Sequence, residues 1–423
     1  MKRSYFVVGL VMVIFFVISL LTNILNSLLP TIKADFGLSF ALAGFLPFSF
    51  FLAYGVMSVP SGMLIERYRE RPVLVASFAV AFAGSLLFAT QPRYSIALGS
   101  LFLIGLGMAM LQVAINPLLR VAGGEEHFAF FSVLAQFVFG LASWWSPSLY
   151  SYLMRNLEAG EGVRALWLRV LARLAPPAMP WVALYWIFAL VALVMIVLLT
   201  LVRLPAVERK DDEKAGSVET HVQLLRKPAV VLFFVGIFAY VGTEQGVANW
   251  ISEFLRLYHG YDPVTAGAEA VKWFWGSMTI GCLLGLILLK LFDSRRVLVV
   301  FACAAIVTLS LALFGPAQVS YFAFQALGFC ASVMWSIVFS LALNSLDRHH
   351  GSFSGILCTG IVGGAVLPWV IGLLADHIGL RLGMTVLYLT LGYILSIGFW
   401  ARPLVANATL LGGDARGSTR EAC

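Results

Sequence analysis

Amide side chains recur inside apolar segments of this 423-residue chain, at spacings that place them on one face of a helix. Asn23 and Asn26 are three residues apart, and Gln112 and Asn116 are four residues apart just before a proline. Side chains at these separations are neighbours on a helix surface. An amide offers two donors and an acceptor, so it can meet both functions of a sugar hydroxyl. The alternative is hydrogen bonding between helices, which uses the same residue types.

Further polar and aromatic side chains extend this pattern into the second half of the chain. Gln136 adds an amide to the first half, and Gln245 and Asn249 lie one turn apart in the second. A row of polar residues consists of Gln325, Ser332, Ser336, Ser340 and Asn344, with a first step of seven residues and then steps of four. This spacing places them along one face of a helix and is typical of a surface that faces water. Trp335 can stack on a pyranose ring, although tryptophans near the ends of spans also serve as interfacial anchors. The predicted sugar site comprises Asn23, Asn26, Gln112, Asn116, Gln136, Gln245, Asn249, Trp335 and Ser336.

Glu244 stands out because it alone of the 21 acidic residues falls well inside an apolar segment. A single carboxyl group in such a place stays protonated, titrates during transport, or holds a cation. We therefore predict that Glu244 couples transport to a proton or a sodium ion. The alternative is a neutral acid that is hydrogen-bonded to a neighbouring helix.

The elements that position these residues are expected to be membrane-spanning helices. Hydrophobic residues make up 61% of the chain and the mean hydropathy is +0.92, while charged residues make up 12%, about half of the roughly 25% usual in soluble domains. Apolar segments of helical length predict twelve spans. They run near 5–29, 40–64, 72–90, 94–119, 127–153, 180–202, 229–254, 266–291, 296–315, 317–345, 352–376 and 381–401.

A polar linker at residues 203–228 divides the spans into two six-helix bundles, residues 1–202 and 229–402, followed by a tail at 403–423 that we expect to be disordered and cytoplasmic. Paired repeats with a site near the midplane are a common plan of transporters. If the N-terminus is inside, the inner segments carry 19 of the 28 basic residues and the outer segments carry 9, which favours cytoplasmic termini.

The connection at 154–179 is an exception, because its basic residues alternate with leucines at helical spacing. This pattern predicts a helix lying on the outer membrane surface, and an ordinary capping loop is the alternative.

The sequence lacks the residues that several other classes of function require. The five cysteines show no CxxC spacing, and no histidine falls inside a span, so neither a metal site nor an intramembrane enzyme is supported. The net charge of +7 follows the basic loops of a membrane protein and does not indicate nucleic acid binding. We expect a monomer that contacts membrane lipids, has no catalytic residues, and needs no cofactor beyond a possible coupling ion.

Two kinds of motif resemble known transporters. The segment GMLIERYRER, from Gly62 to Arg71, resembles the loop between the second and third spans of the major facilitator superfamily, and a weaker echo occupies Gly285 to Arg296. Six further segments, in order, are similar to the fucose:proton symporter family, above all to its glucose/galactose transporter branch. They are FFLAYGVMSVPSGML, LQVAINP, YVGTE, FWGSMTIGCLLG, SVMWSIVFSLAL and IVGGAVLPWVIGLLAD.

The resemblance implies an all-α fold of twelve transmembrane helices in two bundles, which alternate access to a central sugar site. Glu66, Arg67 and Arg71 would then form a gating latch on the inner side. The family's two proton-carrying acids fall on Asn26 and Gln112, and an amide cannot titrate, which leaves Glu244 as the coupling candidate.

The resemblance therefore implies an importer of a hexose or deoxyhexose in a bacterial inner membrane, which we expect to be driven by proton or sodium symport. A facilitative sugar uniporter is the first alternative, because the two acids are missing. An exporter of lipophilic drugs is the second.

Overall fold

In a computed structural model of the chain, all regular elements of the described residues are helical; these residues are 5–123, 128–158, 165–202, 204, 218–346 and 350–404. The first half contains α1 (Tyr5–Asn23), α2 (Leu25–Asp35), α3 (Phe40–Tyr68), α4 (Glu70–Thr90), α5 (Tyr94–Gly123), α6 (Phe128–Glu158), α7 (Leu166–Leu174), η3 (Pro180–Val182) and α8 (Ala183–Leu201). The second half contains α9 (Val218–Leu225), α10 (Pro228–His259), η5 (Pro263–Gly267), α11 (Ala268–Leu291), α12 (Ser294–Phe314), α13 (Ala317–Ala331), α14 (Met334–Leu343), α15 (His350–Thr359), η6 (Gly360–Val362), α16 (Gly363–Ile378), α17 (Leu380–Gly383), η7 (Met384–Val386) and α18 (Leu387–Trp400).

The predicted spans are present as helices. Eleven stretches of the described chain are long and apolar enough to cross a membrane. α6, with 31 residues, occupies the position of the remaining predicted span at 127–153. Within the predicted linker, the part that the structure describes forms α9. Residues 205–217 of the linker and 405–423 of the tail lie outside the described chain.

Three spans that the sequence predicts as continuous are divided near the middle. Span eleven is divided by η6, which separates α15 from α16. Span one is interrupted at Ile24, where the Ser27 N–H donates to the Ile24 carbonyl at 3.1 Å. Span ten is interrupted between α13 and α14, where the Ser332 N–H donates to the Phe329 carbonyl at 3.2 Å. Both bonds join residues three apart, so each interruption is a tightened turn of the kind that marks hinges in helices.

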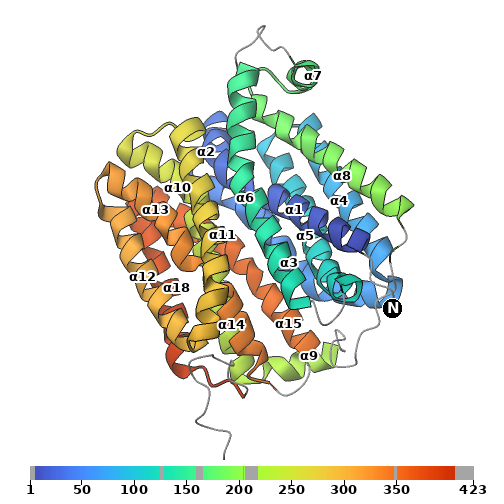
Figure 1. The fold of residues 1–423 in the computed structure, drawn as a ribbon. Coiled ribbons are helices and arrows are strands. Elements are labelled where there is room, and N and C mark those ends of the chain that lie inside the picture. Colours follow the sequence, from blue (N-terminus) through green and yellow to red (C-terminus); the bar gives the residue numbers. More distant parts are fainter. Residues whose placement is uncertain are drawn as a thin grey trace, which may run out of the picture.

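The helices of each half pack mainly with one another, and the two halves meet chiefly along four helix pairs. In Figure 1 the first half, in blue to green, lies beside the second, in yellow to red. α3 packs against α15 and α16, α6 against α11, and α2 against α10. The interface between the halves therefore runs the length of the bundle.

Glycines allow α3 and α16 to approach closely near one end of this interface. A Cβ at Gly44 would lie 2.8 Å from the Trp369 Cα, and a Cβ at Gly372 would collide with the Phe40 carbonyl. Small residues permit such backbone contact between membrane helices, where packing replaces the hydrophobic effect as the driving force. The two halves are thus closely fitted at the end of the molecule where α3 begins.

An ion pair joins the halves at the same end. Lys33 Nζ of α2 lies 3.2 Å from the carboxylate of Glu253 on α10, whose side chain is 1% exposed. Arg256 also donates to both oxygens of Glu253, at 2.7 and 2.8 Å. Lys33 lies over the Phe40 ring at 4.1 Å. Two cations thus satisfy a buried carboxylate that would be costly alone.

Asp376 of α16 caps the first turn of α3 from the other half. Its two oxygens accept the backbone N–H groups of Phe40 and Ala41, at 2.7 and 2.8 Å. The first N–H groups of a helix have no partner within the helix, and a carboxylate there also meets the positive end of the helix dipole. We call this end of the bundle, with Lys33, Phe40, Glu253 and Asp376, the sealed end.

Overpacking the α3–α16 contact should separate the halves. Gly44→Ala places a methyl group against the backbone of Trp369, and such insertions cost about 1–3 kcal/mol. We expect a lower thermal unfolding midpoint for the purified protein than for Gly99→Ala, whose new Cβ meets no atom within 4 Å. Equal midpoints for the two variants would contradict the close contact.

Removing the Asp376 cap should loosen the sealed end without unfolding either half. A lost charge-assisted hydrogen-bond pair at an exposed site is worth about 1 kcal/mol, or roughly fivefold in the population of opened molecules. With Asn249→Cys as a reporter one turn before Glu253, Asp376→Ala should raise the rate of thiol labelling from this end about fivefold. Asp293→Ala removes a cap within one half, on Arg295 N, and should leave the rate unchanged.

Candidate functional site

Amides from both halves lie at similar depths below the sealed end. α2 and α10 pack together, and both run towards the Lys33–Glu253 pair. At ~1.5 Å per residue, Asn26 lies ~10 Å before Lys33 along its helix and Asn249 lies ~6 Å before Glu253. Glu244 lies ~14 Å before Glu253 on the same scale. The predicted residues of α1, α2 and α10 are therefore gathered in the interior, behind the sealed end.

Asn23 belongs to a polar network inside the first half. Its Nδ2 donates to Ser143 Oγ of α6 at 2.8 Å, and Ser143 Oγ also lies 2.7 Å from Ser19 Oγ. Ser19 donates to the Phe139 carbonyl at 2.6 Å. Sequence reasoning missed Ser19 and Ser143, although Ser19 lies one turn before Asn23 at a same-face spacing.

Three buried amides keep part of their hydrogen-bonding capacity. Asn23, Asn26 and Asn249 are at most 1% exposed. Within the described part of the chain, no partner lies within hydrogen-bonding distance of Asn23 Oδ1, Asn26 Nδ2 or Asn249 Oδ1. Because a buried polar atom without a partner is costly, such atoms suit a polar ligand. They offer acceptors from both halves and a donor from α2.

Gln245 and Asn249 form a pair on α10, as their spacing predicts. Asn249 Nδ2 donates to the backbone carbonyl of Gln245 at 2.8 Å and lies 3.4 Å from the side-chain Oε1 of Gln245. Gln245 packs at Gly364 of α16, where Phe51 of α3 also makes contact. It therefore lies where the two halves meet.

Glu244 is surrounded by polar and aromatic side chains of the second half. Its carboxyl group interacts with the side chains of Tyr240 and Gln245, and Cys282 of α11 lies close by. Cys282 Sγ donates to the Ser332 carbonyl at 3.2 Å, in the tightened turn between α13 and α14. Sequence reasoning did not include Tyr240, although it lies one turn before Glu244 in the YVGTE motif.

Trp335 adjoins the Glu244 cluster. Its ring lies 6.0 Å from that of Tyr240 and stacks on Phe339 at 5.7 Å, measured between centroids. Ser336, the next residue, is exposed. Along the predicted polar row, Ser332 is buried and its hydroxyl donates to the Phe329 carbonyl, whereas Ser336 and Ser340 are exposed.

The remaining amides lie on α5 and α6. Gln112 is half-buried on α5, and the side chain of Asn116 lies outside the described residues. Gln136 is exposed, one turn before Gly140, which contacts Thr279 of α11. Gln136 thus lies on the face of α6 that meets the second half, farther from the sealed end than Gly140.

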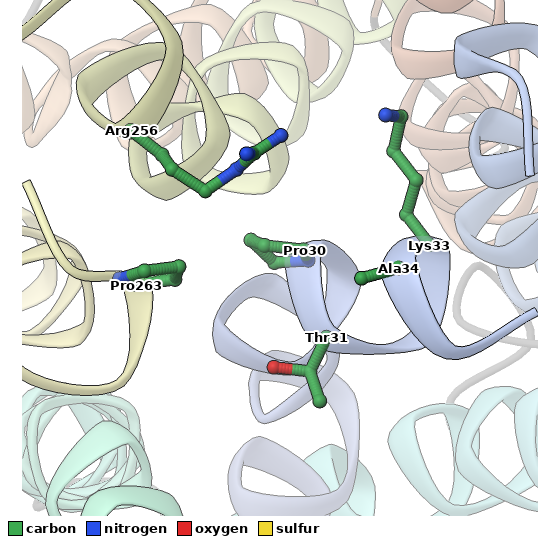
Figure 2. Close-up of a pocket in the computed structure, with 6 residues that line it drawn as sticks. All are labelled: Pro30, Thr31, Lys33, Ala34, Arg256 and Pro263. Carbon is green, nitrogen blue, oxygen red and sulfur yellow. The ribbon is translucent and has the colours of Figure 1, made fainter. Parts of the chain in front are cut away.

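A small cavity of about 200 Å³ lies at the sealed end. Figure 2 shows its six lining residues, four of them from α2 and two from the second half: Pro30, Thr31, Lys33, Ala34, Arg256 and Pro263. Pro30 is one turn beyond Asn26 on the same helix. The cavity therefore lies between the buried amides and the surface.

The predicted gating residues lie at the opposite end of the bundle, which we call the Arg71 end. Glu66 and Arg67 are exposed in the last turn of α3. Arg71 donates to the carbonyls of Leu199, at 3.0 Å, and Thr200 at the end of α8. A cation suits the negative end of a helix dipole, so these contacts hold Arg71 within the first half.

Among the described residues, no three histidine, cysteine, aspartate or glutamate side chains form a group that could hold a metal ion. The candidate site is therefore a cluster of amides, hydroxyl groups, aromatic rings and one carboxyl group. This chemistry suits a polar, uncharged ligand.

Comparisons with known proteins agree with this architecture. Residues 11–368 match the Major Facilitator Superfamily. The chain is 30% identical to the glucose/galactose transporter of Brucella abortus, over 94% of each chain. It is 25% identical to the L-fucose-proton symporter of Escherichia coli, over 89% of each chain. A crystal structure of the Escherichia coli fucose:proton symporter superposes with a TM-score of 0.68 at 21% identity, covering 95% of this chain and all of that one.

These matches confirm the resemblance that the sequence motifs carry, and they extend over nearly the whole chain. The relatives are transporters and not enzymes. The chain is a multi-pass membrane protein that belongs to the Major Facilitator Superfamily.

Proposed function

We propose that this protein imports a hexose or deoxyhexose across a bacterial inner membrane by alternating access. The observation that carries the proposal is the set of buried amide atoms on α1, α2 and α10 for which the described residues supply no hydrogen-bond partner. Sugars present donors and acceptors in equal measure, and amides match both. The names of the relatives, glucose/galactose transporter and L-fucose-proton symporter, support this substrate class.

In the proposed cycle the structure represents the state closed at the sealed end. Sugar enters when the Lys33–Glu253 pair and the Asp376 cap separate, and it leaves at the Arg71 end after they form again. With both termini in the cytoplasm, α2 and α10 end on the outer side, so the sealed end faces outward. Glu66, Arg67 and Arg71 then belong to the inner gate, and a single chain completes the cycle.

We assign coupling to Glu244, whose carboxyl group interacts with the side chains of Tyr240 and Gln245. A carboxyl group in this place can take up a proton or a sodium ion together with the sugar and release it on the other side. The competing function is a uniporter, because Asn26 and Gln112 occupy the positions of the family's titrating acids.

The direct test is uptake of labelled glucose into proteoliposomes, with an inward sodium gradient, then an inward proton gradient, and unlabelled hexoses as competitors. Accumulation above the external concentration under either gradient supports symport and identifies the ion. Uptake that only equilibrates supports the uniporter, and absence of both uptake and competition would overturn the substrate class.

Glu244→Gln should remove concentrative uptake but keep exchange. The amide retains hydrogen bonding and cannot titrate, so the accumulation ratio should fall to about one while sugar counterflow continues. Glu269→Gln, at an exposed acid on α11, should keep the accumulation ratio of the unmodified protein. An unchanged ratio in a folded Glu244→Gln variant would remove Glu244 from the coupling mechanism.

Asn249→Leu should weaken sugar binding. The loss of one or two hydrogen bonds, each worth about 1 kcal/mol, should raise the Kd roughly five- to thirtyfold. Asn156→Leu removes a half-buried amide of α6 that donates to the Tyr152 backbone carbonyl, outside the predicted site, and should not alter the Kd. Isothermal titration in detergent measures the Kd, and thermal unfolding checks that both variants remain folded. Equal affinities would exclude Asn249 from the sugar site.

A further inference from the structure

A ten-residue pattern of the Arg71 end recurs in the second half of the chain. The segment GLLADHIGLR, residues 372–381, has glycine, leucine, an acid and arginine at its first, third, fifth and tenth positions. The segment GMLIERYRER, residues 62–71, has the same four kinds of residue at the same positions. The acids are Asp376 and Glu66. Asp376 contacts the start of α3 and Glu66 lies in its last turn, so the two segments lie at opposite ends of the bundle.

The backbone of the two segments is also the same. α3 ends at the seventh position, Tyr68, and α16 ends at the seventh position, Ile378. The eighth residue has a positive φ in both, 67° at Arg69 and 84° at Gly379. Its N–H donates to the carbonyl four residues earlier, at 2.8 and 3.0 Å respectively. The next helix begins at the ninth position in both segments. Each segment therefore forms the same corner between two helices.

Arg69 indicates that this corner is imposed by its surroundings. Glycine adopts a positive φ without penalty, whereas a residue with a side chain is strained there. Glycine occupies the eighth position at the sealed end, but arginine occupies it at the Arg71 end. Such strain persists only where the surrounding structure determines the conformation, and it is found at switch regions. The shared corner is thus not a consequence of glycine alone, and it indicates a shared use.

The tenth residue holds each segment to its own half. Arg71 donates to the carbonyls at the end of α8. Arg381 lies over the ring of Tyr258 on α10, with its Cζ 4.4 Å from the ring centroid. The backbone N–H of Arg381 also donates to the Tyr258 hydroxyl, at 3.0 Å. The partners of the two arginines differ, but each contact lies within one half of the molecule.

The fifth residue reaches the other half at the sealed end. Asp376, three residues before Gly379, caps the N–H groups of Phe40 and Ala41. Gly372, at the first position, brings α16 against the same turn of α3, because a Cβ there would collide with the Phe40 carbonyl. At the Arg71 end, the helix that carries the other acid, α3, packs against α15 of the second half. Both acids thus lie on helices that adjoin the opposite half.

We propose that residues 372–381 form a latch at the sealed end that is the counterpart of the loop at 62–71, and that Gly379 and Arg381 are its positioning residues. Gly379 turns the chain directly after α16, and Arg381 holds the corner on α10. Together they keep Asp376 on the first turn of α3. The inference rests on the proposed alternating-access cycle, in which this end opens, and it does not depend on the identity of the sugar.

Thiol labelling of Asn249→Cys from the sealed end, in an otherwise cysteine-free chain, measures how often the latch opens. Loss of the Asp376 cap should raise the labelling rate about fivefold, so a residue that acts through Asp376 can raise it by no more. Gly379→Ala should approach this limit, because alanine resists a positive φ. Arg381→Gln should raise the rate about two- to fivefold through the lost contact with Tyr258, and Arg381→Lys should restore part of the closure.

A matched control lies at the same end of the molecule. Gly260, at the end of α10, has a φ of 71°, and a Cβ there would meet no atom within 4 Å. Gly260→Ala therefore strains a turn outside the latch and should leave the labelling rate unchanged. Thermal unfolding checks that each variant is folded. If Gly379→Ala does not fold, the two Arg381 variants decide the test.

Double variants separate positioning from a general loss of structure. If Gly379 and Arg381 act through Asp376, neither Gly379→Ala nor Arg381→Gln should raise the rate further in the Asp376→Ala background. Rates that multiply in the double variants would overturn the proposal. A response to Asp376→Ala without a response to Gly379→Ala or Arg381→Gln would contradict the latch alone, whereas no response to Asp376→Ala would also contradict the opening of this end in the cycle. The measurements contain no sugar, so they are independent of the proposed substrate.

Discussion

A polar group inside a membrane bundle must find its partner in protein or water, because hydrocarbon offers none. This constraint organises the interior of the molecule. The carboxylate of Glu253 is held by two cations, the hydroxyl of Ser19 reaches a backbone carbonyl, and Asn249 bonds back to its own helix. Asn23 Oδ1, Asn26 Nδ2 and Asn249 Oδ1 are among the buried polar atoms to which the described residues offer no partner, and the proposed sugar site uses these three.

The same constraint separates the two ends of the molecule. At the sealed end the halves are joined by charge, by a shared helix cap and by glycine-mediated backbone contact. These interactions are specific and individually modest, so they can break and form again without disturbing either bundle. At the Arg71 end, Arg71 instead donates to carbonyls of its own half, which holds the start of α4 against the end of α8.

Much of the fold could be predicted from the sequence, because long apolar segments and basic loops identify spans without tertiary information. The interruptions at Ile24 and Ser332 could not be predicted, because neither position has a proline or glycine that would signal a break. Conversely, Pro30 and Pro147 lie within helices that continue through them. For the site, the spacing of Gln245 and Asn249 predicted their contact. The grouping of Glu244 with Cys282 and Trp335 depends on packing among α10, α11 and α14, which no local pattern encodes.

The capping of α3 by Asp376 links secondary structure to the state of the transporter. Ser39 satisfies only the Leu42 N–H, so the N–H groups of Phe40 and Ala41 depend on a carboxylate that belongs to the other half. When the halves separate at this end, these two groups pass from a carboxylate to water, and the first turn of α3 loses its fixed partner. The hydrogen-exchange rates of the Phe40 and Ala41 amides should therefore differ between the state closed at the sealed end and the state open at that end.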